Sequence, residues 1–153
     1  MESMKPMKIR EIIEKEPDII RVERNFDMPL TELWDWITKS QLTEQWFGPW
    51  KWTGEGEIEV TLFREEGSPV SKAKIMEINP LKGYTLLMEE DGPAWQLLVS
   101  IDESDDGKSR LILIQPWEGQ EYRREMTAGW EYYADCLVAA IKKTPDPEFE
   151  DYL

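Results

Sequence analysis

Four large aromatic rings lie within seven residues of this sequence: Trp46, Phe47, Trp50 and Trp52. They flank Gly48-Pro49, a dipeptide typical of a turn. Aromatic rings with few polar groups among them are typical of the walls of small-molecule pockets. The same rings are also compatible with a corner of an ordinary hydrophobic core. Both interpretations stay open at this point, and neither involves making or breaking bonds.

A second candidate for ligand contact lies seventy residues further on. Gln115 has the same strand parity as Leu111 and Leu113, so we expect its amide to face the interior. Trp117 follows on the same parity. A buried amide needs partners from the protein, from water or from a ligand. Gln115 therefore indicates a single polar group on an otherwise apolar face.

The sequence offers little for catalysis. It contains no histidine, which removes the usual general base at neutral pH and the commonest metal ligand. The single cysteine, Cys136, lies in a segment that carries acidic residues and an apolar stripe. We expect its side chain to be a small buried hydrophobe. An enzyme built here would depend on a desolvated carboxylate such as Glu77, or on a tyrosine. We predict no catalytic residue, and an activity of cyclase or hydrolase type is our third hypothesis.

The acidic clusters do not form a convincing metal site. Asp102-x-Ser104-x-Asp106-Gly107 resembles the start of a calcium loop, but its twelfth position is Leu113 instead of glutamate. Two other clusters, 89–91 and 148–151, lie at a turn and near the chain end, where solvated charge is the default. No phosphate-binding glycine loop is present. We therefore predict no metal and no cofactor.

The net charge of the chain excludes further classes of function. The formal net charge is −14, which argues against binding to nucleic acid or to anionic membranes, because both need clustered Lys and Arg. No secretory segment and no apolar run long enough to insert into a membrane is present. We expect a cytoplasmic protein of one domain.

Periodicity predicts the elements that must position these residues. Alternating patterns indicate strands at 19–26, 57–62, 70–79, 84–88, 95–101 and 110–116, separated by short turns. A helix begins at Pro29, a second short helix runs from 38–40 to about 47, and a long helix covers 118–143. The order is β-α-α-β-β-β-β-β-α. Such short connections favour an antiparallel sheet of about six strands in an α+β fold.

The long last helix is the element around which the sheet is organised. Its apolar residues recur at steps of three and four, which places them on one face. They are Met126, Trp130, Tyr133, Leu137 and Ala140. We expect Met126 and Trp130 to be the ligand contacts and Leu137 and Ala140 to be plain core.

The strand at 110–116 is apolar on both faces, which an exposed outer face does not explain. Ile112 and Ile114 would be covered either by residues 1–18, an amino-terminal extension, or by a second copy of the chain. We favour the extension, and a homodimer through Ile112 and Ile114 is the alternative. Residues 144–153 are expected to be a tail.

Two segments resemble a known family. The first is Phe26–Thr38 (FDMPLTELWDWIT) followed by Leu42–Phe47 (LTEQWF), and the second is Gly129–Tyr133 (GWEYY) followed by Leu137. Together they are similar to the carboxy-terminal domain of the heat-shock-protein-90 ATPase activator, in the START-like (SRPBCC), birch-pollen-allergen superfamily. The resemblance covers residues 19–143. It implies a helix-grip fold, in which a curved sheet and a long last helix enclose a cavity that often binds lipids or other apolar molecules.

From this resemblance and the residues above, our leading hypothesis is a non-enzymatic module that binds a small apolar or aromatic molecule. A protein-interaction module, chaperone-associated or regulatory, is the second. The predicted cavity wall consists of Trp46, Phe47, Trp52, Trp95, Gln115, Trp117, Met126, Trp130 and Tyr133. Gln115 and the Tyr133 hydroxyl would orient a polar end of the ligand.

Overall fold

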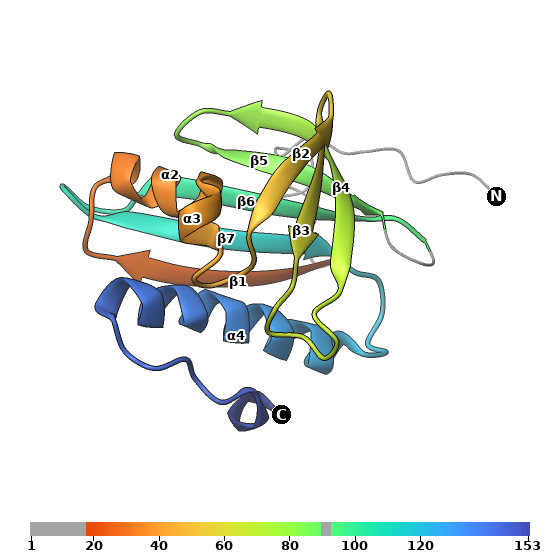
Figure 1. Ribbon diagram of the computed structural model, residues 1–153. Helices are drawn as coiled ribbons and strands as arrows, with labels where there is room; N and C mark the ends of the chain where they lie inside the picture. Colours follow the sequence, from red (N-terminus) through yellow and green to blue (C-terminus); the bar gives the residue numbers. More distant parts are fainter. Residues whose placement is uncertain (1–17, 90–92) are drawn as a thin grey trace.

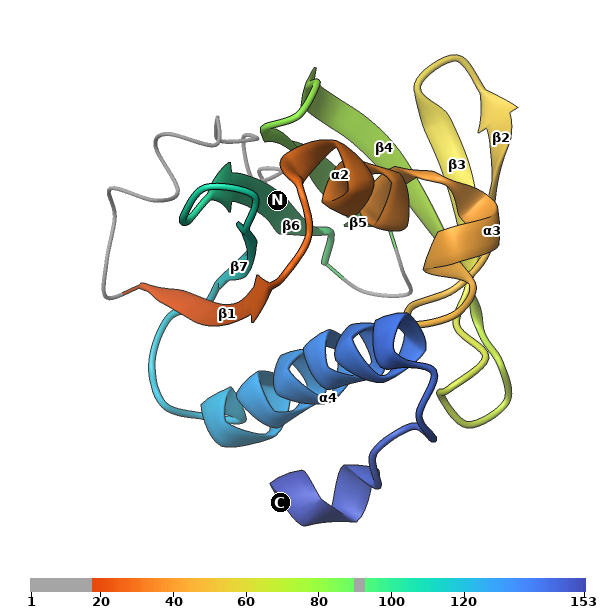
Figure 2. The same ribbon diagram turned by 90° about the vertical axis from the view of Figure 1, so that its left-hand side faces the viewer.

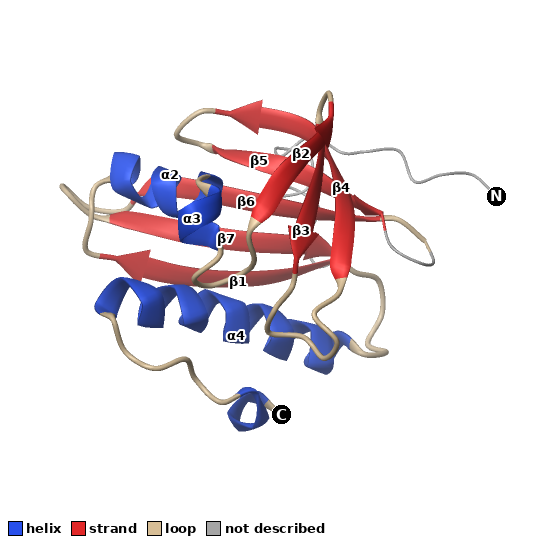
Figure 3. Ribbon diagram, in the orientation of Figure 1, coloured by secondary structure: helices blue, strands red, loops and turns tan. Residues whose placement is uncertain are grey.

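The computed structural model describes residues 18–89 and 93–153. One antiparallel sheet dominates it, with the strand order β1-β7-β6-β5-β4-β3-β2, and three α-helices lie against that sheet (Figures 1 and 3). The strands are β1 (Ile19–Phe26), β2 (Trp50–Gly54), β3 (Glu57–Thr61), β4 (Val70–Asn79), β5 (Gly83–Glu89), β6 (Trp95–Glu103) and β7 (Ser109–Pro116). The helices are α2 (Leu30–Thr38), α3 (Ser40–Thr43), α4 (Arg123–Lys142) and the 3-10 helix η1 (Phe149–Tyr152).

The α+β helix-grip architecture predicted from the sequence is confirmed, with a seventh strand. The extra strand is β2, which pairs antiparallel with β3 through Trp50↔Val60 and Trp52↔Ile58. Periodicity predicted no strand between the second short helix and residue 57. The alternation of Trp50, Lys51 and Trp52 was the strand signal, but five residues at a sheet edge give only a short pattern.

The last helix begins later than predicted, at Arg123 instead of Glu118. Tyr122 precedes it in a left-handed conformation with φ of 59°, so the chain cannot be helical there. The Arg123 guanidinium holds the preceding loop by donating to the backbone oxygens of Gly119 at 2.9 Å and Trp117 at 2.8 Å. These side-chain contacts lie outside any periodic pattern, which is why spacing alone extended the helix.

The sheet curls around its helices. In Figure 2, β1 and β2 lie at opposite sides of the fold, with α2, α3 and α4 gathered against the same face. Residues of that face form the main core together with one side of α4, including Leu137 and Cys136, both fully buried. The concave face therefore contains both the core and whatever cavities the fold leaves.

The opposite face of the sheet carries a small second cluster of Ile19, Leu98, Ile112 and Ile114. Ile112 and Ile114 are only 4% and 0% exposed in the single chain. The amino-terminal segment that we expected to cover them lies outside the described residues, apart from Asp18. Association of two copies through this face stays a prediction, and it is not needed to bury these side chains.

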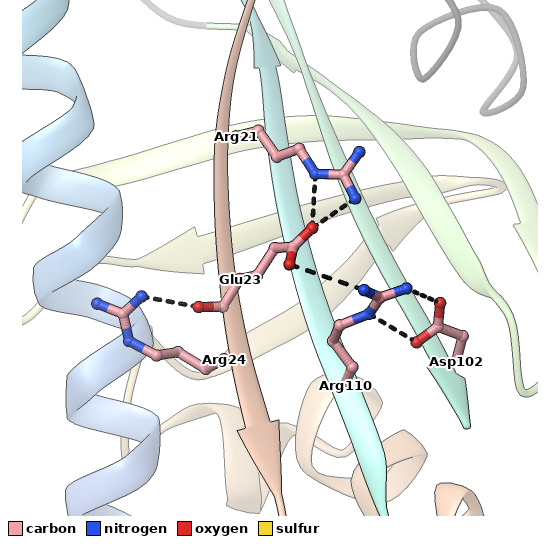
Figure 4. A network of polar contacts seen from close by, with 5 residues as sticks. All are labelled: Arg21, Glu23, Arg24, Asp102 and Arg110. Atoms are coloured by element: carbon pink, nitrogen blue, oxygen red, sulfur yellow. Dashed lines mark hydrogen bonds and ion pairs between the residues drawn. The ribbon is translucent and has the colours of Figure 1, made fainter. Parts of the chain in front are cut away.

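Charged side chains crosslink the outer face at β1, β7 and β6 (Figure 4). The Arg110 guanidinium donates to both carboxylate oxygens of Asp102, at 3.0 and 2.6 Å. Its third nitrogen lies 3.7 Å from Glu23, which Arg21 also contacts. Asp102, the first residue of the calcium-like pattern, is thus in an ion pair between neighbouring strands.

Helix α4 lies beside the edge strand β1 and is tied to it by an ion pair. The Arg24 Nε atom lies 2.7 Å from Asp135 Oδ1. Beyond α4 the chain turns back, and η1 packs on the helix through Tyr132, whose ring meets Phe149 edge-on at 5.5 Å. The predicted tail therefore includes a segment docked on α4.

Candidate functional site

A large hollow lies between the first half of α4 and one end of the sheet. Its volume is about 910 Å³, which is within the range typical of small-molecule sites. It is bordered by the start of β1, the end of β7, the β3–β4 and β5–β6 connections and the turn after α3. The wall consists of Asp18, Ile19, Phe47, Leu62, Glu65, Met88, Pro93, Ala94, Trp95, Gln115, Pro116, Trp117, Glu118, Met126 and Trp130.

Trp130 is the centre of the aromatic wall. Its ring lies edge-on to Trp95 at 6.1 Å and stacks with Phe47 at 6.2 Å, with ring planes 19° apart. Helix α4 supplies Trp130, β6 supplies Trp95 and the turn after α3 supplies Phe47. Three elements far apart in sequence therefore present one continuous apolar surface to the cavity.

The buried polar group of this wall is Gln115, which is 3% exposed. Its Oε1 accepts a hydrogen bond of 2.7 Å from the Trp130 indole nitrogen. Because an indole N–H can only donate, this bond fixes which end of the amide is the oxygen. The sequence prediction that Gln115 faces the interior is confirmed.

Tyr133 lies one turn after Trp130 on α4 and does not line the cavity. Its hydroxyl donates to Glu65 Oε2 at 2.6 Å, joining α4 to the β3–β4 connection. Burial, followed by this hydrogen bond, raises the pKa of Tyr133 well above its ordinary value. The hydroxyl is therefore a neutral donor already used by Glu65, and no longer a free group for orienting a ligand.

The structure brings together six of the nine predicted wall residues along this cavity: Phe47, Trp95, Gln115, Trp117, Met126 and Trp130. The other three lie elsewhere. Trp46 is 3% exposed and donates its indole N–H to the Trp36 carbonyl at 2.9 Å, inside the core. Trp52 lies on the edge strand β2 and is 59% exposed, and Tyr133 stands behind Phe47 at 5.0 Å.

A second, smaller hollow of about 240 Å³ occupies the other end of the concave face. It lies between α2, α3 and strands β2 to β5, and is almost wholly apolar. Phe47 lines both hollows, so its ring separates them. The wall of the smaller hollow consists of Trp34, Ile37, Thr38, Thr43, Phe47, Gly48, Trp50, Trp52, Ile58, Val60, Ile75, Ile78, Tyr84 and Leu86.

Sequence reasoning missed the carboxylates of the larger cavity: Asp18, Glu65 and Glu118. Each lies at the end of a strand or in a connection, where acidic residues usually have no role beyond solvation. No spacing signal distinguishes them from the other acidic residues of this chain. Their placement depends on how the strand ends and the β3–β4 connection meet in three dimensions.

The arrangement offers no evident catalytic machinery among the described residues. Glu77, the carboxylate we considered for an enzyme, lies at a bulge of β4, accepts from Asn79 Nδ2 at 3.2 Å and lines neither hollow. Burial raises the pKa of the Cys136 thiol, which disfavours the nucleophilic thiolate. Within residues 18–89 and 93–153 no cluster of acidic, Cys or His side chains is arranged to hold a metal ion. No helix in those ranges is long and apolar enough to span a membrane.

Comparison with known proteins supports the architecture. No protein-family model and no curated protein matches the sequence. Among solved structures, CalU16 from Micromonospora echinospora is 21% identical, with a TM-score of 0.70 over 88% of this chain and 80% of CalU16. DynU16, a protein in the dynemicin biosynthetic locus, is 18% identical with a TM-score of 0.71; the match covers 86% of this chain but only 50% of DynU16.

The Aha1 dimer from Colwellia psychrerythraea is also similar, at 13% identity and a TM-score of 0.65 over 80% of this chain and 94% of that protein. Identities this low are informative about the fold and not about the ligand. This chain accordingly shares its helix-grip fold with these proteins.

Proposed function

We propose that this protein is a START-like, non-enzymatic module that binds a small apolar or aromatic molecule in the cavity beside Trp130. The observation that carries the proposal is the wall itself: a hollow of about 910 Å³ lined by Phe47, Trp95, Trp117 and Trp130. Such rings supply large contact area with little conformational freedom to lose. A single buried amide, Gln115, supplies orientation.

The test uses N-phenyl-1-naphthylamine, an uncharged fluorescent molecule whose emission rises in apolar surroundings. We expect saturable binding of about one molecule per chain. Met126→Trp, which adds bulk on the α4 wall, should weaken binding by about tenfold, the effect of roughly 1.4 kcal/mol. The matched control is Ile78→Trp in the smaller hollow, which should leave the affinity within about twofold. Absence of saturable binding, or equal losses in both variants, would contradict the proposal.

The second candidate is a protein-interaction module, and one observation favours it. Strand β2 leaves a sheet edge unpaired among the described residues. Its Trp52 is 59% exposed, and Ile78 of β4, which lines the same small hollow as Trp52, is 53% exposed. Open edges next to apolar surface are common sites of association. If two copies of this chain associate through that edge, Trp52→Lys should lower the association constant measured by sedimentation. A wild-type chain that is monomeric at all concentrations would count against self-association here.

A further inference from the structure

The cavity wall is strongly asymmetric in charge. Three carboxylates line it, Asp18, Glu65 and Glu118, and no lysine or arginine of the described residues does. Asp18 and Glu118 belong to the same rim, because the Trp117 backbone N–H donates to the Asp18 carbonyl at 3.0 Å and joins the ends of β1 and β7. Glu65 reaches the cavity from the β3–β4 connection.

One basic residue, Arg123, is bonded to the backbone beside this rim. Arg123 donates to the backbone oxygens of Ile19, Trp117 and Gly119, and it does not line the cavity. These hydrogen bonds to neutral carbonyls fix the guanidinium in place but do not remove its charge. An anionic ligand entering here would still meet three acidic residues against this one guanidinium, in a protein of net charge −14.

Deep in the cavity the available polar group is a hydrogen-bond donor instead of a carboxylate acceptor. The Gln115 oxygen is bonded to Trp130, so the amide nitrogen is the end left to interact with something else. That nitrogen has no hydrogen-bond partner among the described residues. Among the described residues, Thr85 Oγ1 is the one fully enclosed side-chain polar atom without a hydrogen-bond partner. The Gln115 amide nitrogen also has no partner, so it is not fully enclosed and is accessible from the cavity that Gln115 lines.

A buried amide N–H requires an acceptor, whereas carboxylates at the rim attract a cation. We propose, building on the ligand-binding function above, that the ligand is an apolar molecule with an uncharged acceptor oxygen at its buried end and an amine cation at its outer end. The carbonyl or ether oxygen accepts from Gln115. The ammonium group lies among Asp18, Glu65 and Glu118, and carboxylates and phosphates are rejected.

The experiment compares three naphthyl ketones that differ only at the far end: 2-acetylnaphthalene with a methyl, an aminomethyl or a carboxymethyl group at ring position 6. Each displaces N-phenyl-1-naphthylamine from the whole protein. We expect the amine to bind about tenfold more tightly than the carboxylate, and the difference to shrink as salt is raised from about 50 mM to about 500 mM. The ketone should also bind more tightly than the same methylnaphthalene with ethyl in place of acetyl.

Variants locate the effect. Asp18→Asn with Glu118→Gln should reduce the amine-to-carboxylate ratio to about threefold or less while the methyl ketone keeps its affinity. Glu121→Gln, in the same loop but away from the cavity wall, is the control that should leave the ratio unchanged. The comparison of acetyl with ethyl uses the wild-type protein, so it does not depend on a Gln115 variant remaining folded.

The outcomes separate this inference from the function on which it rests. If the methyl ketone and N-phenyl-1-naphthylamine bind but the amine and the carboxylate bind alike, the charge preference is wrong and the binding function stands. If acetyl and ethyl compounds bind alike, the role of Gln115 is wrong. If none of these molecules binds, both the function and the inference are overturned.

Discussion

The indole nitrogen of Trp130 donates a hydrogen bond of 2.7 Å to the side-chain oxygen of Gln115. Both residues are buried, at 7% and 3% exposed, and they connect α4 to β7 across the wall of the larger cavity. This one contact fixes the position of the central ring of the cavity wall and the orientation of the Gln115 amide. We therefore expect its loss to affect both the stability of the protein and the proposed binding.

A double-mutant cycle on this pair should show strong coupling. Gln115→Leu leaves a buried indole N–H without an acceptor and should lower the free energy of unfolding by about 1–3 kcal/mol. Trp130→Phe removes the donor instead. The double variant should lose clearly less than the two single losses added, because both unsatisfied groups are gone. Urea denaturation measures all four chains, and simple additivity would contradict the importance of this bond.

Two glycines should respond oppositely to alanine. A Cβ on Gly48 would lie 2.1 Å from the Thr61 carbonyl oxygen, so the turn that places Phe47 between the two hollows would have to shift. Gly48→Ala should cost about 3 kcal/mol, as overpacking does. Gly129, within α4, has nothing within 4 Å of such a Cβ, and Gly129→Ala should stabilise the protein by up to about 1 kcal/mol.

Thermal or urea unfolding measures the stability of both glycine variants, and Gly129→Ala is the control for Gly48→Ala. If both alanines were tolerated equally, the close approach of Gly48 to β3 would not be a constraint on the turn. A stable Gly48→Ala that binds N-phenyl-1-naphthylamine normally would also remove Gly48 from the positioning of Phe47.

Strand periodicity predicted most of the fold because most strands have one buried face and one polar face, although β7 is apolar on both. Strands β1 and β4 have the predicted boundaries, and β7 begins one residue earlier. The failures are at places where local chemistry overrides spacing. Strand β2 is an edge strand with an exposed Trp52, and the left-handed Tyr122 stops a helical pattern that would otherwise run back to Glu118.

The site was less predictable than the fold for a physical reason. Rings on predicted elements, such as Trp95 and Trp130, could be assigned to the interior face, and they meet at the cavity. Which interior rings line space and which fill it depends on three-dimensional packing. Trp46 shows this, since its neighbour Phe47 lines the cavity while Trp46 itself is enclosed and bonded to the Trp36 carbonyl.

Alkaline pH should destabilise the protein through its tyrosines. Burial raises the pKa of Tyr84 and Tyr133 above the ordinary value and the pKa of Tyr132 to about 12. Unfolded tyrosine has a pKa of about 10, so above that pH the unfolded chain binds fewer protons than the folded chain. The tyrosine contribution to the free energy of unfolding should therefore be constant below about pH 9 and fall as the pH rises above about 10.

Urea midpoints at about pH 8 and about pH 11 measure this fall, and a difference of zero would contradict it. Tyr84→Phe separates the contributions. It removes the hydrogen bond of 2.7 Å from the Tyr84 hydroxyl to the Ile37 carbonyl, which should cost about 1 kcal/mol at neutral pH. Because one titrating group is gone, the same variant should lose less stability than the wild type on going to high pH.

Acid should release the contact between α4, β1 and the carboxy-terminal segment. Asp135 accepts from Arg24 at 2.7 Å and from the Tyr152 hydroxyl at 2.6 Å. Burial acts to raise the pKa of Asp135, but these two hydrogen bonds outweigh it and the net pKa is lowered. A lowered folded pKa stabilises the protein above the unfolded pKa of about 3.9, and this contribution is lost as the pH falls through the folded pKa.

Asp135→Asn should therefore cost about 1 kcal/mol at pH near 7, a modest value because Arg24 and Asp135 are about one-third exposed and solvent screens the pair. The cost should shrink in acid, below the unfolded pKa of about 3.9, as the pH falls toward the lowered folded pKa and the wild-type carboxyl takes up a proton. Asp35→Asn is the matched control, since the more exposed pair of Asp35 with Lys39 should be worth less than about 0.5 kcal/mol. Denaturant unfolding in acid and at neutral pH measures the cost of Asp135→Asn. If that cost is the same at both pH values, the carboxylate charge does not hold α4 to β1.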